Sequence, residues 1–191
     1  MDIGNPILDG PVLLNLKSNG VATITLNRPQ SLNALNREMG TAFMQALDEI
    51  EKRRQIKVVV WTGAGKALSG GGDIEMLLST ENNAEARATF ERAYIQNKRF
   101  YDLPMPVIVA VNGPVAGVST GRCLAADIII ACEEAKFAVN FANIGLLPDG
   151  GTSYLLFKKL GHQHTAELLF KGQVLDAQQC LELGIYNKVV S

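Results

Sequence analysis

Two glycine-containing turns are the parts of this sequence whose backbone groups could do chemistry. The first covers residues 63–72 and ends on three successive glycines. The second, Asn112-Gly113-Pro114, leads into mostly small residues over 116–126. Successive glycines cost folding entropy and mark unusual backbone angles or a close approach to a ligand. Unpaired N–H groups at the start of a helix attract negative charge. We therefore expect the second turn to offer amides to an oxygen that carries or develops negative charge.

Each turn also has an explanation without chemistry. The run Gly70–Gly72 can be a flexible surface loop, and the small residues over 116–126 can form an ordinary, closely packed helix. Asp73 and the apolar Ile74 follow the glycines at once, which favours an anchored element. The pattern of each turn, taken alone, leaves both alternatives open.

The composition is that of a globular chain with little net charge. The chain has 191 residues, of which 47% are hydrophobic and 19% charged, so we expect one well-buried domain over residues 1–191. A net charge of −1 without any block of like charge argues against a nucleic-acid partner. No apolar run is long enough to span a membrane, and the N-terminus lacks the positive charge of a signal peptide. We expect a cytoplasmic protein with no membrane partner.

Cysteine and histidine offer little further chemistry. Cys123, Cys132 and Cys180 form no CxxC pair, so reduced, buried thiols are expected. His162 and His164 are the two histidines of the sequence, and they are too few to indicate a metal site or a histidine-based triad. We therefore expect no metal ion.

Strand and helix patterns alternate along the chain and would position both turns. Asn36 is a candidate N-cap for the helix that follows it. The alternation indicates an α/β domain with parallel strand pairing. The expected strands cover residues 12–16, 21–26, 57–62, 107–111, 128–131 and 185–190. The expected helices cover residues 37–54, 84–103, 116–126, 152–160 and 164–170, with a short last helix capped by Asp176.

Six segments, in their order and spacing, resemble the crotonase superfamily, the enoyl-CoA hydratases and isomerases. The resemblance covers nearly the whole chain. It implies an α/β fold, the crotonase (ClpP-like) spiral of ββα units, and a homo-oligomer, either a trimer or a hexamer. Relatives continue past the point matching Val190 with further helices, so a missing C-terminal helical segment is expected. The segments are NRPQSLNALN (27–36), GAGKALSGGGDI (63–74), PVIVAVNGPVAG (106–117), AADIIIACEEAKFA (125–138), IGLLPDGGTSYLL (144–156) and ELGIYNKVV (182–190).

The resemblance also implies the ligand and its contacts. The ligand is an acyl-CoA thioester, with coenzyme A present as part of the substrate and no other cofactor. The implied oxyanion hole consists of the backbone amides of Gly72 and Val118. Two such donors stabilise the oxygen of an enolate, and one donor can contribute about 3 kcal/mol. The other positions implied to bind substrate are Ala34, Ser69, Asp73, Ile74, Gly117 and Phe141.

The acidic residues depart from the hydratase pattern of the family. Hydratases carry two glutamates, and the matching positions here hold Gly121 and Phe141, neither of which can move a proton. The loss of both acids argues against ordinary hydration. Arg122, beside the first of these positions, could pair with an acid or contact the substrate.

Asp149 is the one carboxylate that remains near the implied site. In the single-acid Δ3,Δ2-enoyl-CoA isomerases that this stretch resembles, one acid, mostly glutamate, takes a proton from C2 and returns it to C4. Phe141, Leu146 and Leu147 would keep the site dry and raise the pKa of Asp149 toward that of a useful base. The alternative is that Asp149 caps the helix starting near Gly151.

Three hypotheses follow from these residues. The first is an enoyl-CoA isomerase in which Asp149 moves the proton and the amides of Gly72 and Val118 hold the enolate. The second is a non-catalytic acyl-CoA-binding protein, since both hydratase glutamates are lost. The third is another thioester reaction, or a hydratase-like enzyme of a different specificity, at the same oxyanion hole.

Overall fold

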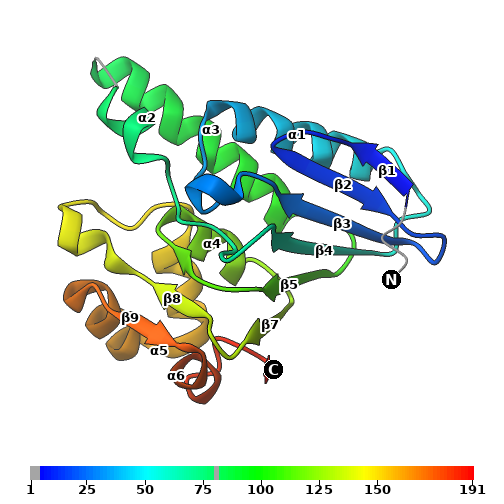
Figure 1. Cartoon of the computed structure of the whole chain (residues 1–191). Helices are drawn as coiled ribbons and strands as arrows, with labels where there is room; N and C mark the ends of the chain where they lie inside the picture. Colours follow the sequence, from blue (N-terminus) through cyan, green and yellow to red (C-terminus); the bar gives the residue numbers. More distant parts are fainter. Residues whose placement is uncertain (1–4, 80–81) are drawn as a thin grey trace.

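The computed structural model describes residues 5–79 and 82–191, which form a large mixed sheet and a small sheet with helices packed on them (Figure 1). The large sheet has the strand order β1-β2-β3-β4-β5-β7-β10, and the small sheet has the order β6-β8-β9. The strands are β1 (Asn5–Leu8), β2 (Val12–Leu16), β3 (Val21–Leu26), β4 (Val58–Gly63), β5 (Val107–Val111), β6 (Val115–Ala116), β7 (Ile128–Cys132), β8 (Lys136–Ala138), β9 (Val174–Asp176) and β10 (Lys188–Val190).

The helices are α1 (Arg37–Glu51), α2 (Ile74–Leu78), α3 (Asn83–Tyr101), α4 (Val118–Leu124), α5 (Thr152–Lys171) and α6 (Ala177–Glu182), with 3-10 turns η1 (Pro29–Ser31) and η2 (Asn140–Ile144). Of the helices, α1 packs against β2 and β3 of the large sheet, and α4 and α6 pack against strands of the small sheet (Figure 1). None of the helices in the described ranges is long and apolar enough to cross a membrane.

Parallel pairing dominates the large sheet, as the alternation of strands and helices predicted. β1, β2 and β3 pair antiparallel, and every pair from β3 onward to β10 is parallel. Parallel strands need helical crossovers that cover the sheet faces, which explains their continuous apolar runs. Trp61, Val109 and Ile129, one from each of β4, β5 and β7, are fully buried.

Most expected elements are confirmed, and the differences have local causes. Asn36 caps α1, since its side chain accepts a hydrogen bond from Met39 N at 2.9 Å. Gly161 breaks α5 with φ 75° and ψ −179°, where two helices were expected. The helix expected over 116–126 begins later, at Val118, because Ala116 pairs with β8. Gly117 then turns the chain with φ 53°, a backbone conformation that excludes a helix at this point.

Candidate active site

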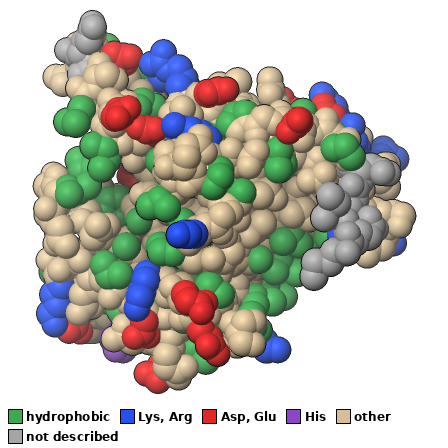
Figure 2. All heavy atoms as spheres, in the orientation of Figure 1, with side chains coloured by type: hydrophobic (Ala, Val, Ile, Leu, Met, Phe, Trp, Pro, Cys, Tyr) green, Lys and Arg blue, Asp and Glu red, His purple; other side chains and the backbone are tan. Residues whose placement is uncertain are grey.

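A cavity of about 540 Å³ opens where the two glycine-containing turns meet α1 and α3. Its wall includes Gly72, Val118 and Asp149 together with apolar side chains of α1, α3 and η2. Around its mouth, Ile74, Phe90 and Ile144 are exposed, and Figure 2 shows hydrophobic side chains exposed on this side of the molecule. A concave, mostly apolar site with a few convergent polar groups is typical of a small-molecule site.

The two predicted turns lie against each other. Gly71 has φ +93°, and a Cβ at this position would lie 2.8 Å from the Ala116 carbonyl oxygen and 3.4 Å from Gly117 Cα. Ala116 N donates to Ser69 O at 3.0 Å, which joins the turns directly. Gly71 is therefore required for this close backbone approach, and neither turn is a separate surface loop.

The amides predicted to form the oxyanion hole flank this contact. Leu35 N donates to the Gly71 carbonyl oxygen at 2.7 Å, and the Leu35 carbonyl oxygen accepts from Asp73 N at 3.1 Å. Gly72 therefore lies between two residues whose backbone groups are already hydrogen-bonded. Val118 is the first residue of α4, where a helix leaves its N–H groups without an internal acceptor. Within the described ranges, neither amide donates a hydrogen bond. Both residues line the cavity, and their role as the oxyanion hole stays a prediction.

Asp149 presents a carboxyl group to the same cavity. Its Oδ1 is buried and has no hydrogen-bond partner among the described residues. Burial raises the pKa of Asp149 from 3.8 to about 6, because the charged form loses its hydration. A carboxyl group with a raised pKa and an unused oxygen is suited to accept a proton at neutral pH.

The expected alternative role of Asp149 as a helix cap is wrong. The N-cap of α5 is Gly151, with no hydrogen bond from a side chain, and Thr152 N donates to the backbone oxygen of Asp149 at 2.9 Å. Because the main chain closes this turn, the side chain is left to face the cavity. Phe141 and Leu146 line the cavity as expected, but Leu147 is 87% exposed and does not shield the carboxyl group.

A buried amide holds the turn that carries Asp149. Asn97, on α3, donates from Nδ2 to the carbonyl oxygen of Gly150 at 3.1 Å. A Cβ at Gly150 would lie 2.6 Å from Asn97 Nδ2 and 2.9 Å from the Val118 carbonyl oxygen. Asp149 is therefore fixed against the start of α4, next to the predicted oxyanion donor.

The same turn occupies the space beside Gly121. A Cβ at Gly121 would lie 2.3 Å from the Gly150 carbonyl oxygen and 2.9 Å from Thr152 Oγ1. No side chain fits at this point of α4, because real Cβ atoms do not approach backbone atoms so closely. The turn bearing Asp149 and an acid at position 121 thus exclude each other in this backbone.

The other residues predicted to bind substrate divide into two groups. Gly117, Ile74 and Phe141 line the cavity. Ser69, Ala34 and Asp73 lie outside its wall and join neighbouring segments. Ser69 is fully buried and its Oγ donates to Asn33 O at 2.9 Å, while Arg28 donates to Ala34 O at 2.8 Å and Asp73 Oδ2 at 3.1 Å. A substrate contact by these three stays a prediction.

Asn97 carries no recognisable signal in the sequence, and Arg122 was singled out only by its position beside Gly121. Asn97 lies within a polar helix pattern, and its burial at 6% exposure depends on the packing of α3 against α4. Arg122 was considered as the partner of an acid, but no described carboxylate forms an ion pair with it. No group of three or more potential metal ligands occurs within residues 5–79 and 82–191.

Comparisons with known proteins agree on one family. Residues 16–191 match the family model described as enoyl-CoA hydratase/isomerase. The chain is 33% identical over 181 residues to a trans-2-decenoyl-[acyl-carrier-protein] isomerase of Streptococcus mutans, covering 93% of this chain and 68% of that protein. It is 34% identical over 186 residues to a 1,2-epoxyphenylacetyl-CoA isomerase of Escherichia coli, covering 93% and 69%.

Solved structures give the same result for the fold. An enoyl-CoA hydratase from Bacillus anthracis superposes with a TM-score of 0.91 at 28% identity. The match covers 95% of this chain and 70% of that one. The crotonase fold predicted from the six segments is therefore confirmed.

Proposed function

The chain belongs to the enoyl-CoA hydratase/isomerase family, and from that premise we propose that it is an isomerase that moves the double bond of a 3-enoyl thioester into conjugation. Family membership implies a CoA-thioester substrate. The choice of isomerisation over hydration rests on the acidic residue in the cavity wall. The observation that carries it is Asp149, the carboxyl group in the cavity wall, with a buried and unused oxygen.

In the proposed reaction Asp149 moves one proton within one ligand. Its carboxylate takes a proton from C2, and the C–H electron pair passes to the thioester carbonyl to give an enolate. The amides of Gly72 and Val118 donate to that oxygen and lower the barrier. The protonated Asp149 then delivers its proton to C4, and the double bond moves from C3=C4 to C2=C3. One acid suffices because the proton that leaves is the proton that returns.

The residues at two positions argue against hydration, because this family's hydratases carry glutamate there and this chain does not. Phe141 has no acid, and Gly121 has no room for any side chain beside the Gly150 carbonyl oxygen. Adding water needs one group to activate the water and another to manage the proton given to carbon. Relatives with isomerase names support the proposal, although hydratases are found among the relatives as well.

The test compares wild type with Asp149→Asn, which keeps the shape of the side chain and removes its basicity. With 3-hexenoyl-CoA as substrate, appearance of the conjugated thioester is followed by its absorbance. The variant should lose about 100-fold to 10,000-fold in rate, the usual contribution of a positioned acid or base. Glu75→Gln is the matched control, because Glu75 is an exposed carboxylate that does not line the cavity.

Two results would refute the proposal. One is an Asp149→Asn variant that isomerises at the wild-type rate. The other is a wild-type protein that hydrates 2-hexenoyl-CoA faster than it isomerises 3-hexenoyl-CoA. Tight binding of acyl-CoA by calorimetry without turnover of any enoyl-CoA would favour the non-catalytic binding protein instead.

A further inference from the structure

Arg122 places a buried positive charge at the wall of the cavity. The residue is 1% exposed and lies in α4, four positions after Val118. Residues four apart share one face of a helix, so the Arg122 side chain and the start of α4 lie on the same side. Four residues advance about 6 Å along a helix axis. Arg122 is therefore about one helical turn beyond the predicted oxyanion donor, and it lines the same cavity.

Within residues 5–79 and 82–191, the guanidinium group contacts uncharged groups only. Nε donates to Asn97 Oδ1 at 2.9 Å, and Nη2 makes a long contact of 3.5 Å with Gln96 Oε1. Cζ lies 4.0 Å from the ring centroid of Phe43 and 5.7 Å from that of Trp61. These hydrogen bonds use two of the five N–H donors of a guanidinium group. Asp149, in the same cavity, forms no ion pair with it.

A buried cation without an anionic partner is costly to the fold. A ring face recovers part of the lost hydration, but charges this deeply buried are normally paired. Burial lowers the pKa of Arg122 to about 9, which leaves the group protonated at neutral pH. The described chain does not supply the compensating anion, so a ligand in the cavity is the remaining source.

We propose that Arg122 binds a carboxylate carried by the acyl group of the ligand, so that thioesters with a carboxylate at the far end of the acyl chain are preferred to simple fatty acyl thioesters. The inference rests on the proposed function for the identity of the ligand as a thioester. An acyl chain whose carbonyl meets the amides of Gly72 and Val118 can extend along α4 toward Arg122. The planar fork of a guanidinium group matches a carboxylate, which makes Arg122 a specificity-determining residue.

The first test uses the wild-type protein and matched pairs of ligands. Calorimetry compares succinyl-, glutaryl- and adipyl-CoA with butyryl-, pentanoyl- and hexanoyl-CoA. At least one carboxylate ligand should bind 10-fold or more tightly than its uncharged counterpart. If the uncharged member binds as tightly or more tightly in all three pairs, or if no acyl-CoA binds, the inference is wrong. Binding preference is measured without turnover, so it can stand even where the isomerase assay fails.

The second test assigns the preference to one side chain. Arg122→Leu should remove the preference for the carboxylate ligand and leave binding of the uncharged partner within about threefold. Arg99→Leu is the control, because Arg99 lies outside the cavity wall and pairs with Asp48 and Glu51. Free CoA should bind both variants equally. Loss of free CoA binding in Arg122→Leu would instead place a CoA phosphate on Arg122 and overturn the assignment.

A variant that fails to fold does not end the test. Arg122→Lys keeps a positive charge but loses the fork, so the preference should fall at least threefold while circular dichroism stays that of wild type. An unchanged preference in Arg122→Lys and in Arg122→Leu would show that the carboxylate is read elsewhere.

Discussion

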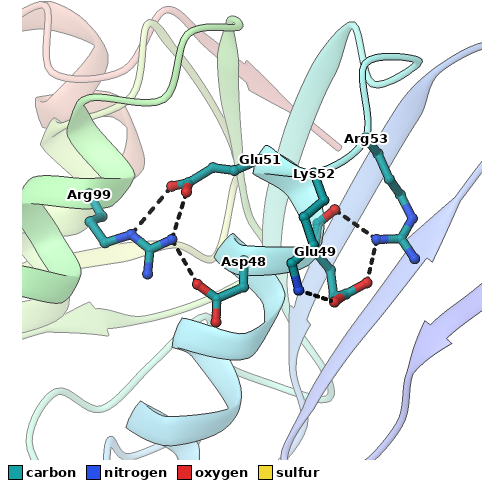
Figure 3. A network of polar contacts seen from close by, with 6 residues as sticks. All are labelled: Asp48, Glu49, Glu51, Lys52, Arg53 and Arg99. Carbon is teal, nitrogen blue, oxygen red and sulfur yellow. Dashed lines mark hydrogen bonds and ion pairs between the residues drawn. The ribbon is translucent and has the colours of Figure 1, made fainter.

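Arginine side chains have different partners on the outer and inner sides of the contact between α1 and α3. On the outer side Arg99 of α3 donates to Asp48 of α1 at 2.9 Å and to Glu51 of α1 at 2.8 Å (Figure 3). A separate group at the end of α1 has Glu49 accepting from Lys52 and Arg53 (Figure 3). On the inner side a second arginine, Arg122, packs between a ring of α1 and two amides of α3 without a carboxylate.

The proposed site accounts for this difference, because the outer groups serve the fold and the inner groups would serve a ligand. The outer ion pairs are solvated, and such pairs contribute little each. The inner groups are a guanidinium that pairs with no described carboxylate, a carboxyl oxygen with no described partner and two amides that donate to no described acceptor. Buried polar groups without partners are expected mainly at functional sites, where other parts of the structure offset their cost in stability. The four predictions below test whether the inner side behaves as a ligand site.

The largest of these four effects is expected when one inner amide is removed. Val118→Pro deletes the N–H at the first position of α4, where proline fits the helix well. Isomerisation of 3-hexenoyl-CoA should fall about 100-fold to 1,000-fold, the usual cost of losing one oxyanion donor. Val118→Ala, which keeps the amide, is the control and should stay within about fivefold of wild type by the same reasoning. Equal rates for Val118→Pro and Val118→Ala would remove this amide from the site.

The second effect measures how tightly the inner side is filled. Gly121→Ala would force a methyl group to 2.3 Å from the Gly150 carbonyl oxygen and should cost about 3 kcal/mol in the free energy of unfolding. Gly40→Ala, also within a helix, meets only the movable amide of Gln96 at 2.8 Å. It should change stability by less than about 1 kcal/mol. Urea unfolding midpoints that shift equally in both variants would contradict the tight fit.

The third effect is a pH dependence set by Asp149. The pKa of the Asp149 carboxyl group is 3.8 in the unfolded chain and about 6 in the folded protein. Between these pH values the native state therefore holds a proton that the unfolded chain has lost. Stability should therefore fall as the pH rises from about 4 to about 6, by about 2 kcal/mol after allowance for its partial exposure. In the same interval the rate constant kcat/KM should rise, because the base becomes deprotonated.

Asp149→Asn provides the check on this assignment. Urea unfolding at several pH values should show that the variant lacks the decline in stability between pH about 4 and about 6. The decline would have to be assigned to another group if it persisted unchanged in the variant.

The smallest effect is expected on the outer side. Arg99→Leu breaks two exposed ion pairs and should lower the free energy of unfolding by about 0.5–1 kcal/mol, and by less at high salt. Isomerase activity should be unchanged, since Arg99 does not line the cavity. A loss of activity comparable to that of Asp149→Asn would erase the distinction between the two sides.

The sequence by itself determined the strands of the large sheet other than β1, most helices, the parallel pairing and the pair of turns, but not β1 or the three strands of the small sheet. These features follow from local rules: apolar periodicity, the cap at Asn36 and glycine at positions of positive φ such as Gly161. The six segments and their order identified the family, because motif spacing is itself a property of the sequence. Asp149 was named as the acid, but its alternative role as a cap was left open.

Tertiary structure alone decided which polar groups of the cavity have hydrogen-bond partners and which do not. Asn97 bonds to Gly150 across 53 positions of the chain, and Arg122 bonds to Asn97 across 25. No local pattern encodes such contacts, because they depend on how α3, α4 and the turn after η2 pack together. The same packing exposed Leu147, closed the space beside Gly121 and left Arg122 buried without an acid among the described residues. Burial and pairing are properties of the assembled layers, so they can be read only after the chain has folded.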